Sequence, residues 1–141
     1  MNILLYNVIF NAILVGVILM TQFITYPLFQ IIESDFTKYH QKYTKLMGYL
    51  VAPLMIIELI LVLIITINYY DNLLVILNAS LIIIIWSSTF FLQVPKHNLI
   101  SQKKIKSEIV FLIRSNYIRT LCWILKLIIS LQILDFYQSV Y

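Results

Sequence analysis

Glycine and cysteine are the residue types that this chain has least of. Its 141 residues include two glycines, Gly16 and Gly48, and one cysteine, Cys122. Two glycines this far apart cannot supply the GxxxG spacing that lets membrane helices cross closely, so helix packing must rely on Leu, Ile and aromatic side chains. The same scarcity argues against transporters whose helices are interrupted by Gly and Pro in matching halves. A single cysteine excludes an internal disulfide and a CxxC redox pair, and we expect it to be a small buried hydrophobe.

Long apolar runs are what the chain has in abundance. Hydrophobic residues make up 62% of it and its mean hydropathy is +0.94, well above the roughly half-apolar composition of soluble domains. Four runs match the ~20 residues needed to cross a bilayer, and they cover residues 3–26, 46–67, 73–94 and 109–134. The first run has no basic residue before it and no small-residue cleavage site after it, which indicates a permanent span. The sequence therefore predicts an all-α fold: one integral membrane domain over residues 1–141, a transmembrane four-helix bundle with up-down-up-down topology.

Basic residues are distributed unevenly between the two ends of the predicted bundle. Eight of the ten Lys and Arg residues lie in or beside the first and third connections: Lys38, Lys42, Lys45, Lys96, Lys103, Lys104, Lys106 and Arg114. The turn around Asp71 and the tail after Asp135 have none. The positive-inside rule then predicts a multi-pass protein of the cell inner membrane, with both termini extracytoplasmic and loops 27–45 and 95–108 cytoplasmic. The net charge of +4 follows from this uneven distribution of Lys and Arg. Basic loops beside a membrane usually face anionic lipid headgroups, and no nucleic-acid partner is predicted.

Prolines and short polar stretches set the expected helix boundaries. Pro27 lies just past the first apolar run, and the third run is expected to end near Pro95. Ser34 and Asp35 are the expected N-cap of a second helix that begins at Phe36. No internal repeat or low-complexity segment is evident.

Each predicted span carries a stripe of polar side chains on one face. In lipid such a stripe should face the bundle interior, since helix positions seven or eleven apart share a face. Near the cytoplasmic boundary the stripes supply seven candidate ligand-binding residues: Gln22, Tyr26, His40, Gln93, His97, Asn116 and Arg119. We predict a polar pocket that opens toward the cytoplasm. The alternative is a set of interhelical hydrogen bonds that holds the bundle together without a ligand.

Glu58 is the most unusual single residue. It lies thirteen residues beyond Lys45, at a depth of about 20 Å by the rise of a helix. Lys126, twelve residues past Arg114, reaches about 18 Å, whereas Arg119 reaches about 8 Å. A carboxylate at that depth is neutral or paired, so we predict a buried charge pair of Glu58 with Lys126. The alternative is a neutral Glu58 that is hydrogen-bonded to a neighbour.

The two histidines raise the question of a metal or haem. His40 and His97 lie near the membrane edge, whereas membrane haem sites place facing histidines within the spans. No HxxxH or ExxH spacing accompanies them. No metal site is therefore predicted, and the identity of any cofactor stays unknown.

Four short stretches carry a resemblance to known proteins. They are residues 25–29, 36–40, 93–99 and 112–123, with Gln93-Val-Pro-Lys-His among them. Together they resemble small uncharacterised bacterial four-helix integral membrane proteins, and this similarity spans most of the chain. More distantly, Pro95 at the end of the third span and Arg119 in the fourth resemble the anthrone-oxygenase-like membrane family. That family tends to have asparagine two residues after the proline and histidine three before the arginine, where this chain has His97 and Asn116.

Three functions remain open from the sequence. The first is binding of a lipophilic small molecule or a partner helix at the cytoplasm-facing pocket, with Arg119 as a fixed cation for a carboxylate, phosphate or enolate headgroup. The second is a membrane enzyme, oxidoreductase or oxygenase-like, that acts on a quinone- or polyketide-like lipophile with histidine as the proton carrier. The third is a structural subunit of a membrane complex. The expected partners are the lipid bilayer, a lipophilic ligand, and a second copy or other subunit of a membrane complex.

Overall fold

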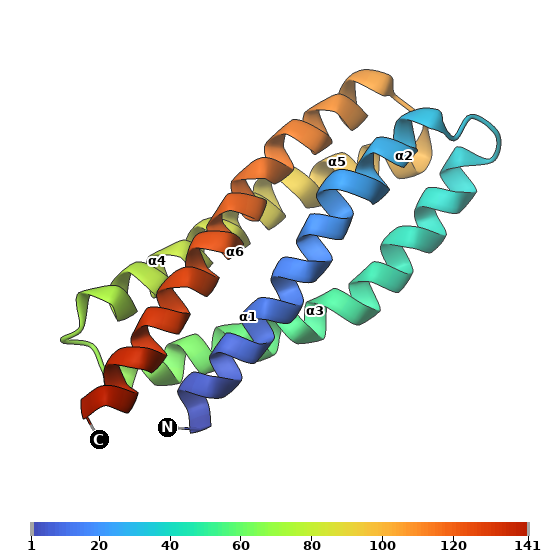
Figure 1. Ribbon diagram of the computed structural model, residues 1–141. Coiled ribbons are helices and arrows are strands. Elements are labelled where there is room, and N and C mark those ends of the chain that lie inside the picture. Colours follow the sequence, from blue (N-terminus) through green and yellow to red (C-terminus); the bar gives the residue numbers. More distant parts are fainter. Residues whose placement is uncertain (1, 141) are drawn as a thin grey trace.

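Four helices long and apolar enough to cross a membrane run antiparallel in the computed structural model, which describes residues 2–140 (Figure 1). The elements in chain order are α1 (Asn2–Met20), the π-helical turn η1 (Thr21–Thr25), α2 (Tyr26–Ile31), α3 (Phe36–Asn68), α4 (Leu73–Ser88), the π-helical turn η2 (Thr89–Gln93), α5 (Val94–Gln102) and α6 (Lys106–Val140). The predicted all-α fold, a four-helix bundle with helices of spanning length, is confirmed.

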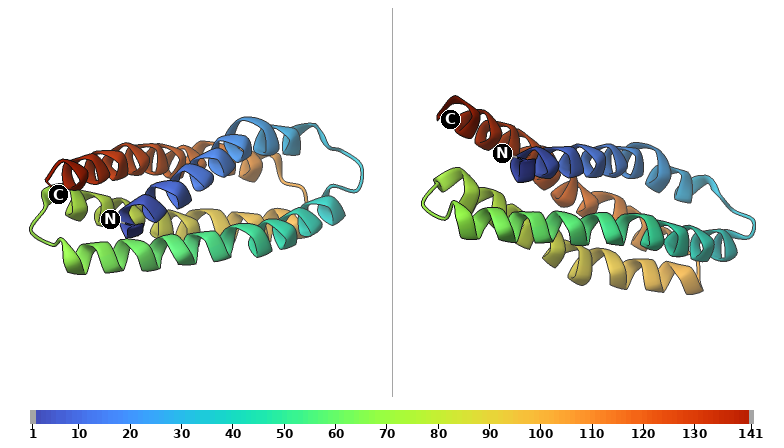
Figure 2. Two further views of the ribbon diagram at one scale, coloured as in Figure 1. Left: turned by 60° about the horizontal axis from the view of Figure 1, so that its bottom comes forward. Right: turned by 90° about the horizontal axis from the view of Figure 1, so that it is seen from below.

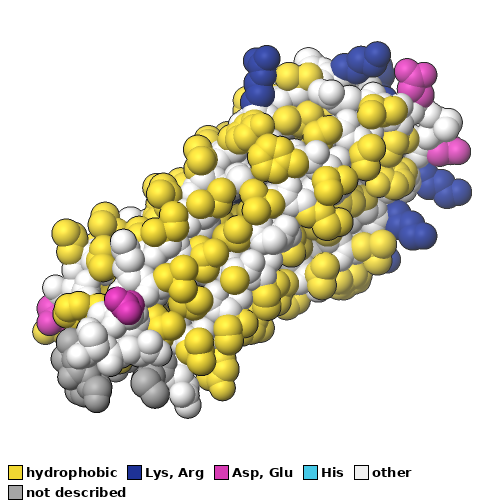
Figure 3. Space-filling view, in the orientation of Figure 1, with side chains coloured by type: hydrophobic (Ala, Val, Ile, Leu, Met, Phe, Trp, Pro, Cys, Tyr) yellow, Lys and Arg dark blue, Asp and Glu magenta, His cyan; other side chains and the backbone are white. Residues whose placement is uncertain are grey.

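The two termini lie at one end of the bundle, and the α2–α3 and α5–α6 connections lie at the other (Figures 1 and 2). We call the second end the basic end, because exposed Lys and Arg side chains gather there (Figure 3). Around the bundle α1 lies between α3 and α6, and α4 lies between the same two helices on the opposite side. Packing is closest where α6 meets α1 and α4, and much sparser between α3 and α4. Leu, Ile and Phe side chains cover the outer surface between the ends, as expected for contact with acyl chains (Figure 3).

The first and third helical segments continue past the prolines that were expected to mark their ends. The chain stays helical through Pro27 to Ile31 and through Pro95 to Gln102. Proline lacks an N–H and its ring clashes with the carbonyl four residues earlier. Each proline is preceded by a π-helical turn, in which the backbone N–H bonds to the carbonyl five residues back and the helix widens. We attribute the tolerance of both prolines to these turns, and the two helices therefore extend beyond residues 26 and 94, where the predicted spans end.

The start of α3 agrees with the sequence, but its cap does not. The helix begins at Phe36, as expected. Asp35 takes a left-handed conformation with φ of 52°, and its side chain makes no capping hydrogen bond. Aspartate is among the residues that adopt this left-handed conformation in tight turns. Asp35 therefore forms part of the turn before α3 and does not cap the helix with its side chain.

The two halves of the chain contain the same helical turn, a repeat that was not predicted from the sequence. The turn η1 begins at Thr21 and η2 begins at Thr89, 68 positions later. Both follow the pattern Thr-x-Phe-x-x-x-Pro, so Pro27 and Pro95 are also 68 positions apart. In both turns the threonine hydroxyl donates to the carbonyl four residues earlier, at 2.8 Å for Thr21 and 2.7 Å for Thr89. Each half is thus a helical hairpin whose first helix contains a π-helical turn at the same place.

Candidate functional site

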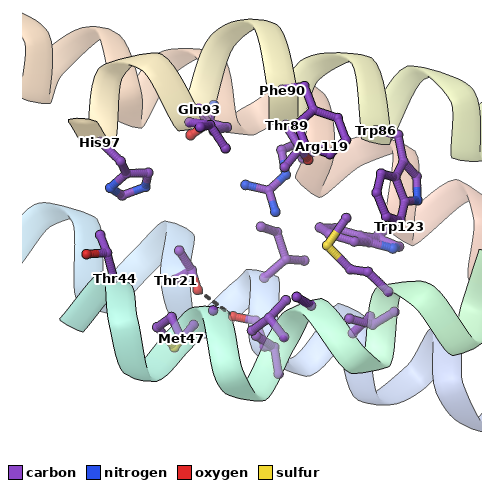
Figure 4. A pocket seen from close by; sticks show the side chains of 18 of the residues that line it. Thr21, Thr44, Met47, Trp86, Thr89, Phe90, Gln93, His97, Arg119 and Trp123 are labelled. Carbon is purple, nitrogen blue, oxygen red and sulfur yellow. Dashed lines mark hydrogen bonds between the residues drawn. The ribbon is translucent and has the colours of Figure 1, made fainter. Parts of the chain in front are cut away.

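A cavity of about 480 Å³ lies inside the bundle, between α3 on one side and α4, η2 and α5 on the other (Figure 4). Its lining comes from all four helical segments and includes residues of both π-helical turns, among them Thr21, Thr89 and Gln93. The cavity occupies the half of the bundle nearer the basic end, because its α3 residues run from Tyr43 to Ile56. Its volume is within the range of roughly 300–1,000 Å³ typical of small-molecule sites.

The cavity is polar toward the basic end and apolar at its deep end. Tyr26, Gln93 and His97 line the polar part, with Arg119 below them. The deep end is closed by aliphatic side chains and by the chain's two tryptophans, Trp86 and Trp123 (Figure 4). Such a gradient matches an amphiphile whose polar head points to the basic end. Further lining residues are Leu14, Val17, Ile18, Thr44, Met47, Gly48, Val51, Ala52, Met55, Phe90, Val94 and Asn98.

Exposed lining residues on α3 and on the η2–α5 segment indicate that the cavity reaches the side of the bundle between them. Gly48 and Ala52, one turn apart on α3, line the cavity and are exposed on the outer surface. Phe90 and Val94 form the facing edge and are also exposed. A side chain at Gly48 would meet no atom within 4 Å, so the glycine leaves open space at this edge. The opening lies at the level of the apolar runs, which makes the bilayer the phase that it faces.

Arg119 is a buried cation without an acidic partner. Its side chain is 8% exposed, its guanidinium points into the cavity, and its Nε has no hydrogen-bond partner (Figure 4). Its Nη1 donates to Asn116 Oδ1 at 3.2 Å, and its guanidinium lies 5.1 Å from the ring centre of Trp123. The ion pairs within residues 2–140 are Lys96–Glu108 and Lys126–Glu58, and neither includes Arg119. A buried guanidinium costs free energy unless an anion compensates it.

Gln22 and Asn116 do not line the cavity but form the hydrogen bonds that position Arg119. Asn116 Nδ2 donates to Gln22 Oε1 at 2.9 Å, and Gln22 Nε2 donates to the carbonyl of Ile113 at 3.2 Å. Thr120 Oγ1 also donates to Gln22 Oε1, at 3.4 Å. These bonds orient Asn116 so that its oxygen faces Arg119. Of the seven residues predicted as ligand-binding, Gln22 and Asn116 are therefore supporting residues, with no surface in the cavity.

His40 is likewise placed behind the cavity wall, while His97, Tyr26 and Gln93 reach the cavity. The two histidines are directly bonded, with His40 Nε2 2.9 Å from His97 Nδ1. His97 Nε2 lies 2.8 Å from the hydroxyl oxygen of Tyr26, which also lies 3.3 Å from Gln93 Oε1. Gln93 in turn donates to Ser115 Oγ at 3.0 Å. The structure thus brings residues from α2, α3, η2, α5 and α6 into one hydrogen-bonded group.

Glu58 and Lys126 form a separate network beyond the deep end of the cavity. Lys126 Nζ lies 3.1 Å from Glu58 Oε1, and both side chains are 0% exposed. This is the partner that the depth comparison favoured over Arg119. Trp123 Nε1 donates to both carboxylate oxygens at 3.2 Å, so the floor of the cavity rests on this pair. Lys126 Nζ also donates to Asn11 Oδ1 at 3.1 Å.

A cluster of side-chain amides continues this network toward the termini. Ser130 Oγ accepts hydrogen bonds from Asn7 at 2.9 Å, from Asn11 at 2.8 Å and from Asn78 at 2.8 Å. All four residues are buried. None of them lines the cavity, so they join α1, α4 and α6 by the polar contacts that membrane helices commonly use.

Several cavity residues were not among the predicted ligand-binding residues. Trp86 and Thr89 lie seven and four positions before Gln93, and Trp123 lies four after Arg119. These spacings put them on the same helix faces as the predicted residues, so the helical period was the available signal. No group of three or more His, Cys, Asp and Glu side chains that suits a metal ion occurs within residues 2–140. Comparison with protein-family models, with curated proteins and with solved structures found no match for this chain.

Proposed function

We propose that this chain is a multi-pass inner-membrane protein that binds a lipophilic molecule with an anionic head, a carboxylate, phosphate or enolate, in the cavity beside Arg119. The single observation that carries the proposal is the buried guanidinium that faces the cavity without an acidic partner. An anionic ligand supplies the missing charge, and arginine suits it because the guanidinium stays charged and offers paired donors.

The rest of the cavity fits the other end of such a molecule. Its deep end is lined by aliphatic and aromatic side chains, and its side opening between α3 and η2 faces the bilayer. A lipophile therefore has a route from the membrane that never crosses bulk water. The positive-inside rule places the basic end in the cytoplasm, so the ligand's head lies at the depth of the cytoplasmic leaflet.

The test uses the chain's own tryptophans, because both of them line the cavity. The protein is placed in phosphatidylcholine nanodiscs and titrated with dibromostearic acid, whose bromine atoms quench tryptophan fluorescence on contact. The methyl ester of the same acid is the control for contact through the bilayer. We expect the acid to quench at lower concentration than the ester.

Two arginine variants make the test specific. Arg119→Gln should weaken binding of the acid by about tenfold to a hundredfold, the range for losing about 1.5–3 kcal/mol from a hydrogen bond to a charged group. Arg114→Gln removes an exposed arginine of the same helix and should leave the titration unchanged. Equal quenching by acid and ester in the parent protein, or an unchanged preference for the acid in Arg119→Gln, contradicts the proposal.

A second candidate function is an enzyme that acts on such a lipophile. The observation that favours it is that His97 and Tyr26, which both donate or accept protons, line the cavity next to Arg119. Native mass spectrometry of the extracted protein separates the two, because an enzyme given its substrate yields a bound product of changed mass. A binding protein returns the ligand unchanged.

A further inference from the structure

A continuous hydrogen-bonded chain runs from the basic end into the cavity. Ser101 Oγ lies 2.7 Å from His40 Nδ1, and His40 Nε2 lies 2.9 Å from His97 Nδ1. His97 Nε2 lies 2.8 Å from the hydroxyl oxygen of Tyr26. Ser101 is partly exposed at the basic end, and Tyr26 and His97 line the cavity. We refer to Ser101, His40, His97 and Tyr26 as the histidine chain.

The histidine chain can be hydrogen-bonded in two opposite directions. In one, Tyr26 donates to His97 Nε2, His97 Nδ1–H donates to His40 Nε2, and His40 Nδ1–H donates to Ser101. In the other, each of these bonds is reversed and the Tyr26 hydroxyl donates to Gln93 Oε1, 3.3 Å away. A neutral imidazole has one donor and one acceptor nitrogen, so both arrangements leave every ring nitrogen satisfied. Passing one proton along the chain converts the first arrangement into the second, or the reverse.

The surroundings of the histidine chain hold the rings in place. His40 is fully buried, stacks on Phe36 with ring centres 5.6 Å apart, and meets the edge of Phe29 at 5.2 Å. Its ring lies nearly parallel to that of His97, at 19°, with the ring centres 5.1 Å apart. A side chain enclosed by aromatic rings exchanges protons through its fixed partners rather than through bulk water. The histidine chain is thus an insulated polar path across an otherwise apolar layer.

We propose that the histidine chain carries protons between the water at the basic end and an ionisable oxygen of the bound ligand. The inference rests on the proposed function, and it narrows the ligand to a lipophilic weak acid, such as a phenol or an enol, that gains or loses its proton in the cavity. Arg119 binds the anionic form of the head, and Tyr26 Oη exchanges the proton with it. The protein would then release a neutral molecule into the bilayer, or take one up and hold it as an anion.

The transfer balances as a relay of single protons. A proton from water binds Ser101 Oγ, whose own proton goes to His40 Nδ1, and His40 Nε2–H passes its proton to His97 Nδ1. His97 Nε2–H passes its proton to Tyr26 Oη, whose own proton goes to the ligand's oxyanion. One O–H bond forms on the ligand, one proton leaves the water, and no electron moves. Delivery leaves the imidazoles in the first arrangement, and a proton that a later ligand loses to Tyr26 Oη and that passes outward to water returns them to the second.

Two other titratable or charged groups face the histidine chain. Tyr43 of α3 lies against both rings, with centroids 6.3 Å from His40 and 6.5 Å from His97, and Arg119 of α6 places its positive charge near His97. Tyr39, which packs on Phe29 at 6.4 Å, lies outside the bonded path and is partly exposed. Neither ion pair within residues 2–140 includes a histidine.

The test follows the protonation of a bound probe. The probe is 4-nitrophenol carrying a dodecyl chain, whose phenolate absorbs in the visible range and whose neutral form does not. Protein in nanodiscs, in excess over the probe, is mixed with acidic buffer in a stopped-flow instrument, and empty nanodiscs give the unbound signal. Tryptophan quenching by the same probe measures binding separately.

Three variants resolve the role of the histidine chain. His40→Phe keeps the ring packing and removes the path, and His40→Gln keeps two hydrogen bonds but cannot relay a proton through its amide. Both should slow loss of the bound phenolate by tenfold or more while the dissociation constant changes by less than about threefold. Tyr39→Phe, which removes a hydroxyl outside the path, should relax at the parent's rate. If His40→Phe does not fold, His40→Gln carries the test.

The outcomes separate this inference from the proposed function. Unchanged relaxation in both His40 variants, with the probe still bound, overturns the proton path and leaves ligand binding intact. Absence of probe binding in the parent protein, together with no preference for dibromostearic acid, overturns both. Slow relaxation confined to the His40 variants supports the path.

Discussion

The buried pair of Glu58 and Lys126 gives the sharpest prediction about stability. Glu58→Gln preserves the shape of the side chain and an acceptor for Trp123, but it leaves Lys126 as a buried cation whose remaining side-chain partner is Asn11. Removing one partner of a buried pair costs about 3–5 kcal/mol, because the other charge stays uncompensated. We expect the free energy of unfolding to fall by that amount in Glu58→Gln, and by a similar amount in Lys126→Met.

The double variant distinguishes an interacting pair from two independent buried groups. Glu58→Gln combined with Lys126→Met buries no charge, so its loss of stability should be smaller than the sum of the single losses. The expected coupling energy is about 2–3 kcal/mol, at the upper end for contacting residues. Reversible unfolding of the purified protein in mixed micelles of increasing SDS content, followed by circular dichroism, measures all three.

The result that refutes this reasoning is additivity. If the double variant loses the sum of the single losses to within about 0.5 kcal/mol, the two charges do not interact. The control is Lys96→Met, which breaks the other ion pair, where the side chains of Lys96 and Glu108 are 27% and 26% exposed. Partly exposed pairs contribute about 0–1 kcal/mol, so this change should be small.

Two further predictions concern the side opening and the amide cluster. Gly48→Leu should fill the edge of the opening, since a Cβ there meets open space. It should therefore slow quenching by dibromostearic acid added to nanodiscs. Gly16→Leu changes the other glycine, which does not line the cavity, and should leave the quenching rate unchanged. Equal rates in the two leucine variants contradict access through this gap. Ser130→Ala should lower the free energy of unfolding by about 1–3 kcal/mol, because three buried amides lose their shared acceptor. The control is Ser80→Ala, which removes an exposed hydroxyl bonded within its own helix. It should change the free energy of unfolding by less than about 0.5 kcal/mol. A Ser130→Ala protein as stable as the parent in SDS titrations shows that water or another group replaces the hydroxyl.

The fold was predictable because apolar length is a strong signal in membrane proteins. Four runs of about 20 residues require four helices, since backbone polar groups in lipid must be satisfied within the segment. The pairing of Glu58 with Lys126 was accessible for a related reason: α3 and α6 both start at the basic end, so residues at equal depth in the two helices lie at the same level. Depth along a helix is a one-dimensional quantity that can be counted from the sequence.

The helix ends and the cavity were harder to predict because they depend on local departures from the helical period. A π-helical turn inserts one residue and rotates everything after it, and a proline just past an apolar run does not reveal such a turn. Whether a polar residue faces the cavity or the helix behind it is decided by small rotations. Gln22, in η1, and His40 and Asn116, in regular helices, were predicted as ligand-binding but lie one layer back from the cavity surface.

The two hairpins belong to one chain and differ in sequence, and this difference bears on how many ligands the protein can hold. Counting 68 positions on from Glu58 reaches Lys126, so like positions carry opposite charges. The same shift pairs Arg119 with Val51, and His97 with Phe29. In a symmetric dimer of two identical hairpins, Glu58 would face a second glutamate instead of Lys126. Each hairpin would also carry the same half of the binding residues. Two hairpins in a single chain are free of that constraint, and here their differences place Arg119 and His97 in one cavity.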